Sequence, residues 1–311
     1  MKRSMKRWIA ALLATALLGT NAALGEGLKV IATCFPCYDL ARQALGDLGE
    51  VTMLIKPGME VHTYEPSPTD ILSIGDADLF LCIGGESEAW VDEVLVSMGD
   101  GAPEVLRLID SVQALKELED DEAEGDAHVH GPEGAPDWDE HIWTSPKNAL
   151  KMLTATEEAL CALAPEQAEA IRANAGAYGE QLSALDARLA DIVAGGVRRK
   201  LVFADRFPFQ YLAHDYGLEV DAAFLSCTSR TEPSARKLME LIDTVIRENI
   251  PVVYTIEMSN GAIAQAVCQE TGAEALELHS MQTVRLEEFE AGETMVSLME
   301  RNAEAIRRGL N

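Results

Sequence analysis

Residues 28–43 read LKVIATCFPCYDLARQ and place a short apolar strand directly before an amphipathic helix. The same order returns in residues 51–55, VTMLI, before a helix predicted from Thr69, and in residues 78–85, DLFLCIGG, before a helix over 86–96. Strands that alternate with helices are typical of a parallel α/β sheet, and ligand sites gather beyond the carboxyl ends of such strands. We therefore predict an α/β fold with a site at these strand ends.

A long helix is predicted in the middle of the chain. Apolar residues recur at helical spacing over residues 165–194, and Gly195 and Gly196 end the pattern. About 30 helical residues span roughly 45 Å, which is enough to cross from one domain to another. After it the alternation resumes, with strands predicted at residues 200–204, 220–224, 252–257 and 275–279.

We predict two parallel-sheet α/β lobes that are joined by one long rigid helix. The boundaries that follow are an N-terminal lobe over residues 26–145, a linker helix region over 146–198 and a C-terminal lobe over 199–311. The hydrophobic content of 48% is that of a packed globular protein, and we expect a monomer.

Residues 1–25 are typical of a secretory signal peptide, with a basic start, an apolar stretch over 8–18 and small residues before Glu26. The apolar stretch is shorter than the roughly 20 residues of a membrane span, although an uncleaved anchor stays open. We expect a protein exported across the cytoplasmic membrane, periplasmic or associated with the cell surface. The formal net charge of −27 disfavours nucleic acid and anionic membranes as partners.

Three histidines occur at the ends of predicted strands or loops. His62 lies in PGMEVHTYEPSP, residues 57–68, His141 lies in DEHIWTSP, residues 139–146, and His279 ends the last predicted strand. Imidazole is a good ligand for Zn²⁺, and a carboxylate or thiolate can complete a four-coordinate site. Histidines spread over both halves suit a metal site between two domains, while solvated loop histidines are the plainer interpretation.

Other polar and cysteine-bearing segments have more than one interpretation. The acidic loop over residues 116–137 carries His128 and His130 and is either a solvated insertion or a weak metal-collecting segment. The six cysteines allow fifteen complete pairings. Cys34 and Cys37 lie at the start of a predicted helix. Three interpretations of these cysteines are compatible with the sequence: a redox role, a structural disulfide and ordinary apolar packing.

The order of these motifs resembles the cluster A-I substrate-binding proteins of ABC transporters for zinc and manganese. The resemblance covers essentially the whole mature chain and is carried by FPCYDLAR, KPGMEVHTYEPSP, DADLFLCIGGESEAWVDEVL, DEHIWTSPKNA and ADRFPFQYLAHDYGL. It implies two α/β lobes with a metal ion in the cleft between them, delivered to a membrane permease by a protein that is not an enzyme. Zinc is the implied metal, with manganese as the alternative.

The resemblance also implies a ligand set. His62 and His141 match the two N-terminal-lobe histidines of the family, and His279 falls where many members place an aspartate, so it is the expected fourth ligand. The third ligand is a histidine near position 205 in many zinc members and a glutamate near position 227 in manganese members. Asp205 and Cys227 are the candidates here, and Cys227 is preferred because a thiolate with three imidazoles suits Zn²⁺ better than Mn²⁺.

Further residues receive supporting or neutral roles. Glu65, Glu140 and Glu257 each lie close to an expected ligand or strand end, and we expect them to orient ring nitrogens or to close the lobes. His128 and His130 match the variable histidine-bearing loop of the family's zinc members. His214 is expected to be a surface residue of a helix.

Two other classes of function compete with metal capture. An exported metallohydrolase needs an open coordination position, a bound water and a positioned general base, and the sequence offers no substrate-recognition loop. A thiol oxidoreductase would act through Cys34 and Cys37.

Overall fold

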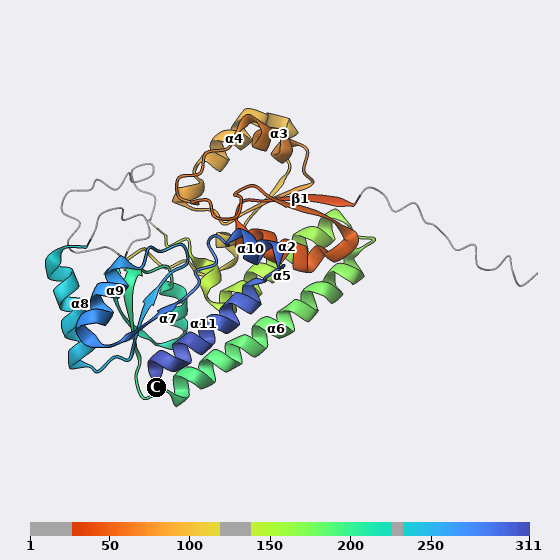
Figure 1. Cartoon of the computed structure of the whole chain (residues 1–311). Coiled ribbons are helices and arrows are strands. Elements are labelled where there is room, and N and C mark those ends of the chain that lie inside the picture. The colour runs from red at the N-terminus through yellow and green to blue at the C-terminus, as the bar shows by residue number, and fades with distance from the viewer. Residues whose placement is uncertain (1–26, 119–137, 226–232) are drawn as a thin grey trace, which may run out of the picture.

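The structure is a computed structural model that describes residues 27–118, 138–225 and 233–311 (Figure 1). The expected signal peptide, the two histidines His128 and His130 and the candidate ligand Cys227 lie outside the described residues. Two four-stranded parallel sheets form the cores of two α/β lobes, which confirms the predicted fold class.

The N-terminal sheet has the strand order β2-β1-β3-β4. Val30 of β1 lies in register with Val51 of β2 and with Leu79 of β3, and β1 and β3 are central and buried. In Figure 1 the helices α3 and α4 lie on one side of this sheet and α2 lies on the other. The elements are β1 Leu28–Ala32, α2 Phe35–Leu45, β2 Gly49–Met53, α3 Pro68–Gly75, β3 Leu79–Cys82, α4 Trp90–Met98 and β4 Glu104–Arg107.

The C-terminal sheet repeats this arrangement, with the strand order β6-β5-β7-β8. Its elements are β5 Lys200–Arg206, α7 Gln210–Tyr216, β6 Glu219–Phe224, α8 Ala235–Arg247, β7 Val252–Thr255, α9 Ala262–Thr271, β8 Glu274–Glu277, α10 Leu286–Glu290 and α11 Met295–Leu310. Because both sheets are parallel, each presents all its carboxyl ends at one edge, where the loops that follow the strands gather.

Two helices, α5 Pro146–Leu163 and α6 Ala168–Gly195, connect the lobes. The 28 residues of α6 extend about 42 Å at 1.5 Å per residue. One face of α6 is buried against α5, α2 and α11, and α11 runs beside α6 in Figure 1. That face carries the apolar residues Ile171, Ala175, Tyr178, Leu182, Leu185 and Leu189.

The edge strand β4 and the short helix α10 were not expected from the sequence. The strand Glu104–Arg107 has one exposed and three half-buried residues, so it lacks the continuous apolar run that marks β3. It forms by pairing with β3, with Leu79 opposite Glu104 and Cys82 opposite Arg107. Edge strands of this kind depend on the neighbouring strand rather than on their own composition.

A buried carboxylate joins the helices that hold the two lobes together. Asp39 of α2 is fully buried, and its Oδ2 accepts hydrogen bonds from the Tyr178 hydroxyl of α6 at 2.6 Å and from the backbone N–H of Met295 at 2.8 Å. Met295 is the first residue of α11, so the carboxylate also lies at a helix N-terminus, where negative charge is favoured. Arg42 donates to Asp39 Oδ1 at 2.8 Å and to the backbone oxygen of Glu293 at 2.5 Å.

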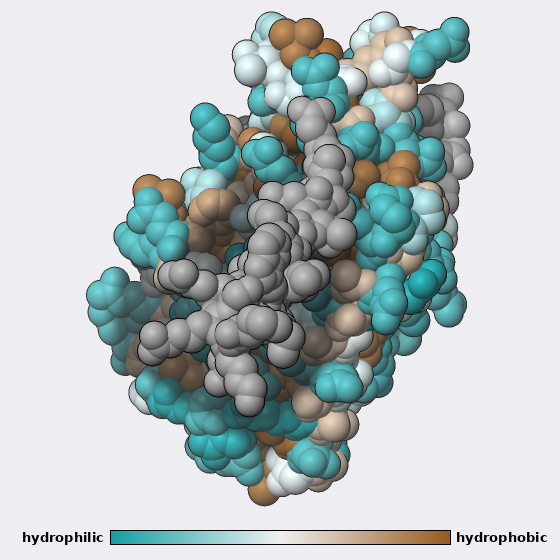
Figure 2. Space-filling view, turned by 90° about the vertical axis from the view of Figure 1, so that its right-hand side faces the viewer, coloured by the Kyte–Doolittle hydropathy of each residue, from teal (hydrophilic) through white to brown (hydrophobic). Residues whose placement is uncertain are grey.

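The outer surface is largely hydrophilic. In Figure 2 hydrophilic residues dominate the outline of the face shown, with hydrophobic residues scattered between them. Exposed hydrophobic side chains such as Leu72, Val96 and Val197 come from separate elements. Within the described part of the chain, no helix is both long and apolar enough to cross a membrane.

We expect Tyr178→Phe to lower the free energy of unfolding by about 1–3 kcal/mol, because a buried hydrogen bond to a charged group is lost. Chemical unfolding followed by circular dichroism measures this change. Tyr38→Phe is the matched control, since it removes a hydroxyl from the neighbouring residue on α2 and retains the ring contacts with Phe289 and Arg42. Equal stability of Tyr178→Phe and the unmodified protein would contradict the role of the Asp39 cluster.

Candidate metal centre

His62 lies on the loop between β2 and α3, as the sequence predicted, and the end of this loop is fixed in place. Tyr64 is buried and its hydroxyl donates to Asp70 at 2.9 Å. Asp70 and Ser67 form a capping box at the start of α3, which begins at a proline whose missing N–H is not needed there. The half-buried His62 is therefore presented on a short segment with an ordered end.

His141 lies directly before a short 3-10 helix, Ile142–Thr144, and is buried. Its Nδ1 lies 2.7 Å from Asp139 Oδ1, which also accepts the backbone N–H of His141 at 2.8 Å. A carboxylate on Nδ1 fixes the tautomer and leaves the lone pair on Nε2, the arrangement of many metal-binding histidines. This local geometry orients the ring before any metal binds.

The structure brings His62 and His141 together from separate segments of the N-terminal lobe. Their ring centroids lie 5.8 Å apart and the rings meet edge to face. Burial, His141 and Arg206 together lower the pKa of His62 to about 3. His62 is consequently neutral at physiological pH, which is the form that binds metal ions.

Gln282 of the C-terminal lobe reaches this histidine pair. Its amide group lies 2.7 Å from Nε2 of His62. Gln282 was not expected from the sequence, although it lies only three residues after His279 on the loop that follows β8. The signal was weak because glutamine is an uncommon metal ligand, and only the approach of the two lobes shows where its side chain lies.

Two further contacts cross between the lobes near His62. The hydroxyl of Thr283 accepts the backbone N–H of Gly58 at 3.0 Å. The guanidinium of Arg206 lies 3.7 Å from the Glu60 carboxylate, which joins the end of β5 to the loop of His62. The carboxyl ends of the two sheets therefore face each other across His62.

Asp205 lies beside Arg206 in β5 and has 9% of its surface exposed. Its Oδ1 accepts the backbone N–H of Arg206 at 2.9 Å, whereas its buried Oδ2 has no hydrogen-bond partner among the described residues. A buried carboxylate oxygen without a partner is costly, and a bound cation would satisfy it. The donor chemistry at this strand end therefore fits a metal ion.

His279 is 2% exposed, and both ring nitrogens make hydrogen bonds within the C-terminal lobe. Its Nε2 lies 3.1 Å from Glu288 Oε2, and its Nδ1 accepts the backbone N–H of Met281 at 2.9 Å. The bond to His279, together with those from Arg285, lowers the pKa of Glu288 to about 2. In this arrangement neither nitrogen of His279 is directed at His62 or His141, and its role as a ligand stays a prediction.

The glutamates that were expected to support the site hold loops instead of ring nitrogens. Glu140 accepts the backbone N–H of Ser87 at 2.7 Å and also its hydroxyl, and a side chain at Gly85 would meet the Glu140 carboxylate at 2.4 Å. Glu257 accepts the backbone N–H of Ser280 at 2.6 Å and lies 3.8 Å from His279 Nδ1.

The third glutamate, Glu65, and the histidine His214 lie at the surface. Glu65 is exposed, and His214 is exposed as predicted, 3.2 Å from Asp215.

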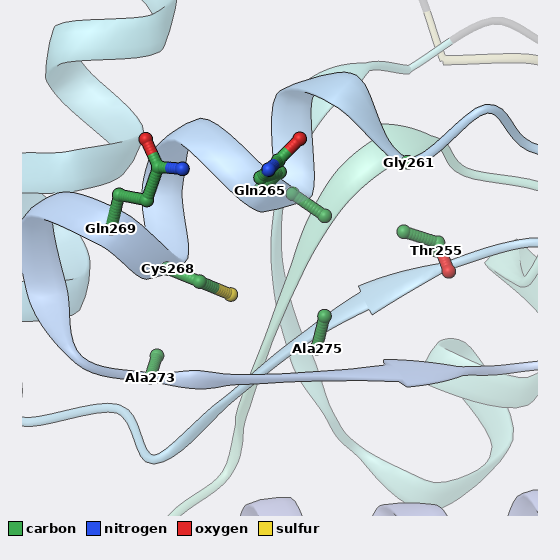
Figure 3. Close-up of a pocket in the computed structure, with 8 residues that line it drawn as sticks. Thr255, Gly261, Gln265, Cys268, Gln269, Ala273 and Ala275 are labelled. Carbon is green, nitrogen blue, oxygen red and sulfur yellow. The ribbon is translucent and has the colours of Figure 1, made fainter.

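The metal-binding groups are not fully assembled within the described residues. Across 27–118, 138–225 and 233–311, no three His, Cys, Asp or Glu side chains lie close enough together to hold a metal ion. Figure 3 shows a separate groove between α9 and the strands β7 and β8, where Gln265, Gln269 and Cys268 lie on the helix. Its lining side chains are uncharged and include no histidine, so we place no metal there.

Comparisons with known proteins agree on one family. The family model described as "Zinc-uptake complex component A periplasmic" matches residues 30–309. The chain is 30% identical over 293 residues to the high-affinity zinc uptake system protein ZnuA of Bacillus subtilis, and the match covers 94% of this chain and 90% of that protein.

Longer relatives and a solved structure extend this result. The chain is 33% identical over 282 residues to the zinc-binding lipoprotein AdcA of Streptococcus pneumoniae, covering 90% of this chain and 55% of that protein. It thus spans about half the length of the first curated relatives it matches. The crystal structure of the Zn(II)-bound ZnuA-like domain of that AdcA matches with a TM-score of 0.76 and 30% identity, covering 91% of this chain and 99% of that one.

The resemblance found in the motifs is thereby confirmed over both sheets, the connecting helices and the segments of His62 and His141. The chain belongs to the family of the periplasmic component A of zinc-uptake complexes.

Proposed function

We propose that this protein captures zinc outside the cytoplasmic membrane and delivers it to the permease of an ABC transporter. The observation that carries the proposal is the pair His62 and His141, whose rings lie 5.8 Å apart where the carboxyl ends of the two sheets face each other. The names of the relatives, which are zinc-binding and zinc-uptake proteins, support zinc as the cargo. They also support an extracytoplasmic, surface-associated location.

We propose His62 and His141 as the two ligands from the N-terminal lobe, each through Nε2. From the C-terminal lobe, the buried Oδ2 of Asp205 supports a carboxylate ligand, and Cys227 stays the alternative outside the described residues. His279 can become the fourth ligand only if its ring leaves Glu288 or the Met281 N–H. Imidazole with carboxylate or thiolate donors favours zinc over manganese, which prefers oxygen ligands.

Gln282 has to move before zinc binds His62. A neutral imidazole nitrogen offers one lone pair, and the Gln282 amide occupies the approach to Nε2 of His62 at 2.7 Å. We propose that Gln282 closes the metal-free site by this hydrogen bond and that the arriving metal displaces it. The exchange costs about 0.5–1.5 kcal/mol, the usual net value of one such bond.

A binding protein fits the site better than the two catalytic alternatives. A metallohydrolase needs a water and a general base beside the metal. The half-buried Glu140, next to His141, and the buried Glu257 instead accept hydrogen bonds from Ser87 and Ser280. A thiol oxidoreductase needs a reactive thiolate, whereas burial raises the pKa of Cys37.

We further propose that the chain acts as a monomer and that its partners are the metal ion and a membrane permease. Its acidic surface attracts cations and disfavours nucleic acid.

We expect the metal-free protein to bind one Zn²⁺ tightly in isothermal titration calorimetry after chelator treatment. His62→Ala should lose most of the affinity, a reduction of at least about 100-fold, because one imidazole–zinc bond and half of the histidine pair are removed. His214→Ala is the matched control, since His214 is exposed and away from the pair. Unchanged zinc binding by His62→Ala would contradict the proposed site.

The ligands of the C-terminal lobe can be separated by three variants, Asp205→Asn, Cys227→Ser and His279→Gln. We expect Asp205→Asn to weaken zinc binding while X-ray absorption at the zinc edge shows only nitrogen and oxygen neighbours. A sulfur neighbour that disappears in Cys227→Ser would assign the third ligand to Cys227 instead. If His279→Gln alters thermal stability but not zinc affinity, His279 acts through Glu288 and not as a ligand.

We expect Gln282→Ala to bind zinc as tightly as the unmodified protein or up to about tenfold more tightly, because the competing hydrogen bond to His62 is gone. Competition with a fluorescent zinc chelator measures the affinity, and stopped-flow mixing measures association. A large loss of affinity would contradict displacement and would identify the Gln282 amide oxygen as a ligand.

A further inference from the structure

Two thiols lie in contact beneath the loops of the N-terminal lobe. Cys34 is the residue before α2 and Cys37 is the third residue of that helix, and their sulfur atoms lie 3.8 Å apart. Both side chains are at most 1% exposed. The Thr33 hydroxyl, at the end of β1, lies 3.8 Å from the Cys37 sulfur. A β1 strand end and a helix start therefore hold the two sulfurs against each other.

A buried carboxyl group acts electrostatically on these thiols. Glu88 is 5% exposed, and its Oε2 accepts the backbone N–H of Gly84 at 2.7 Å. Burial raises the pKa of Glu88 to about 7, although hydrogen bonds from Gly84, Thr33 and Ile83 oppose the rise. Burial raises the pKa of Cys37 most, Cys34 adds to the rise, and the charge of Glu88 adds further. The proposed zinc site uses neither this carboxyl nor the two thiols.

The sulfurs of the remaining described thiols have other partners or lie in the other lobe, although Cys82 of the neighbouring strand β3 is close enough to the pair to raise the pKa of Cys37. The Cys82 sulfur lies 3.8 Å from the backbone oxygen of Leu106, and the Cys161 sulfur lies 3.7 Å from that of Ala168. Cys268 is half-buried on α9 in the other lobe. Among the described cysteines, Cys34 and Cys37 are therefore the pair whose sulfurs are in contact, whereas the sequence alone allows fifteen complete pairings.

We propose that Cys34 and Cys37 close a disulfide in the exported protein. A sulfur–sulfur bond is about 2.05 Å long, so the two sulfurs must approach by a little under 2 Å, within reach of side-chain rotation. Disulfides persist in oxidising compartments outside the cytoplasm, which is where this protein is proposed to act. The pair is a structural cross-link between the end of β1 and α2.

The oxidant is a disulfide, and thiol–disulfide exchange balances the reaction. Before folding buries the pair, one cysteine attacks a sulfur of the oxidant as its thiolate, and the other sulfur of the oxidant leaves as a thiolate. The second cysteine then attacks the mixed disulfide and releases the second thiolate. The two cysteine protons end on the two released thiolates, so the protein is oxidised by two electrons and one oxidant disulfide becomes two thiols.

Mass spectrometry of the full-length exported protein tests the cross-link. The reduced protein is refolded and equilibrated in oxidised and reduced glutathione, so that the oxidant reaches both sulfurs before they are buried. It is then denatured in an alkylating reagent and digested with trypsin, which yields residues 30–42 as one peptide with both cysteines. We expect this peptide to be two hydrogen atoms lighter and free of alkyl groups until a reductant is added. Cys161→Ser is the matched control and should leave this result unchanged.

Two outcomes would overturn the cross-link. One is a peptide in which both cysteines take up the alkylating reagent after equilibration with oxidised glutathione. The other is a linkage of Cys34 or Cys37 to a different cysteine. The result does not depend on zinc binding, so failure of the zinc site and failure of the cross-link are distinguishable.

Discussion

The buried Asp39 carboxylate is the interaction on which the arrangement of the lobes depends. It accepts the Tyr178 hydroxyl of α6 and the backbone N–H at the start of α11, and Arg42 balances its charge. These partners come from the N-terminal lobe, the connecting helix and the C-terminal helix. Removing any of these partners leaves the buried Asp39 carboxylate with an incomplete set of hydrogen bonds, which is costly. The carboxylate therefore holds the three helices in one relative position.

The two lobes meet differently at the other end, around His62. The contacts there are single polar ones: Gln282 with His62, Thr283 with Gly58, and Arg206 with Glu60. Each such contact has a small net free energy, because water can replace its partners. The buried Asp39 cluster fixes the lobes at the helices, whereas the contacts around His62 can be replaced by water. This combination suits a site that opens for an ion and closes over it.

The candidate site was only partly predictable from the sequence. His62 and His141 were found because proline, glycine and acidic neighbours mark their loops, and the structure brings their rings together. Gln282 was missed because its approach to His62 depends on how the lobes meet. His279 was expected to be the fourth ligand from its match to the family, yet Glu288, a residue of α10 that the sequence did not predict, bonds its ring.

The sequence by itself determined the alternation of strands and helices, the long connecting helix and the two histidine loops, because these follow from local periodicity and from proline and glycine. Only the tertiary structure decided which groups face one another: Gln282 against His62, Asp39 against the start of α11, and Cys34 against Cys37. The physical reason is that hydrogen bonds and sulfur contacts between distant segments depend on packing geometry, which leaves no period in the sequence. The same reason explains why β4 forms only beside β3.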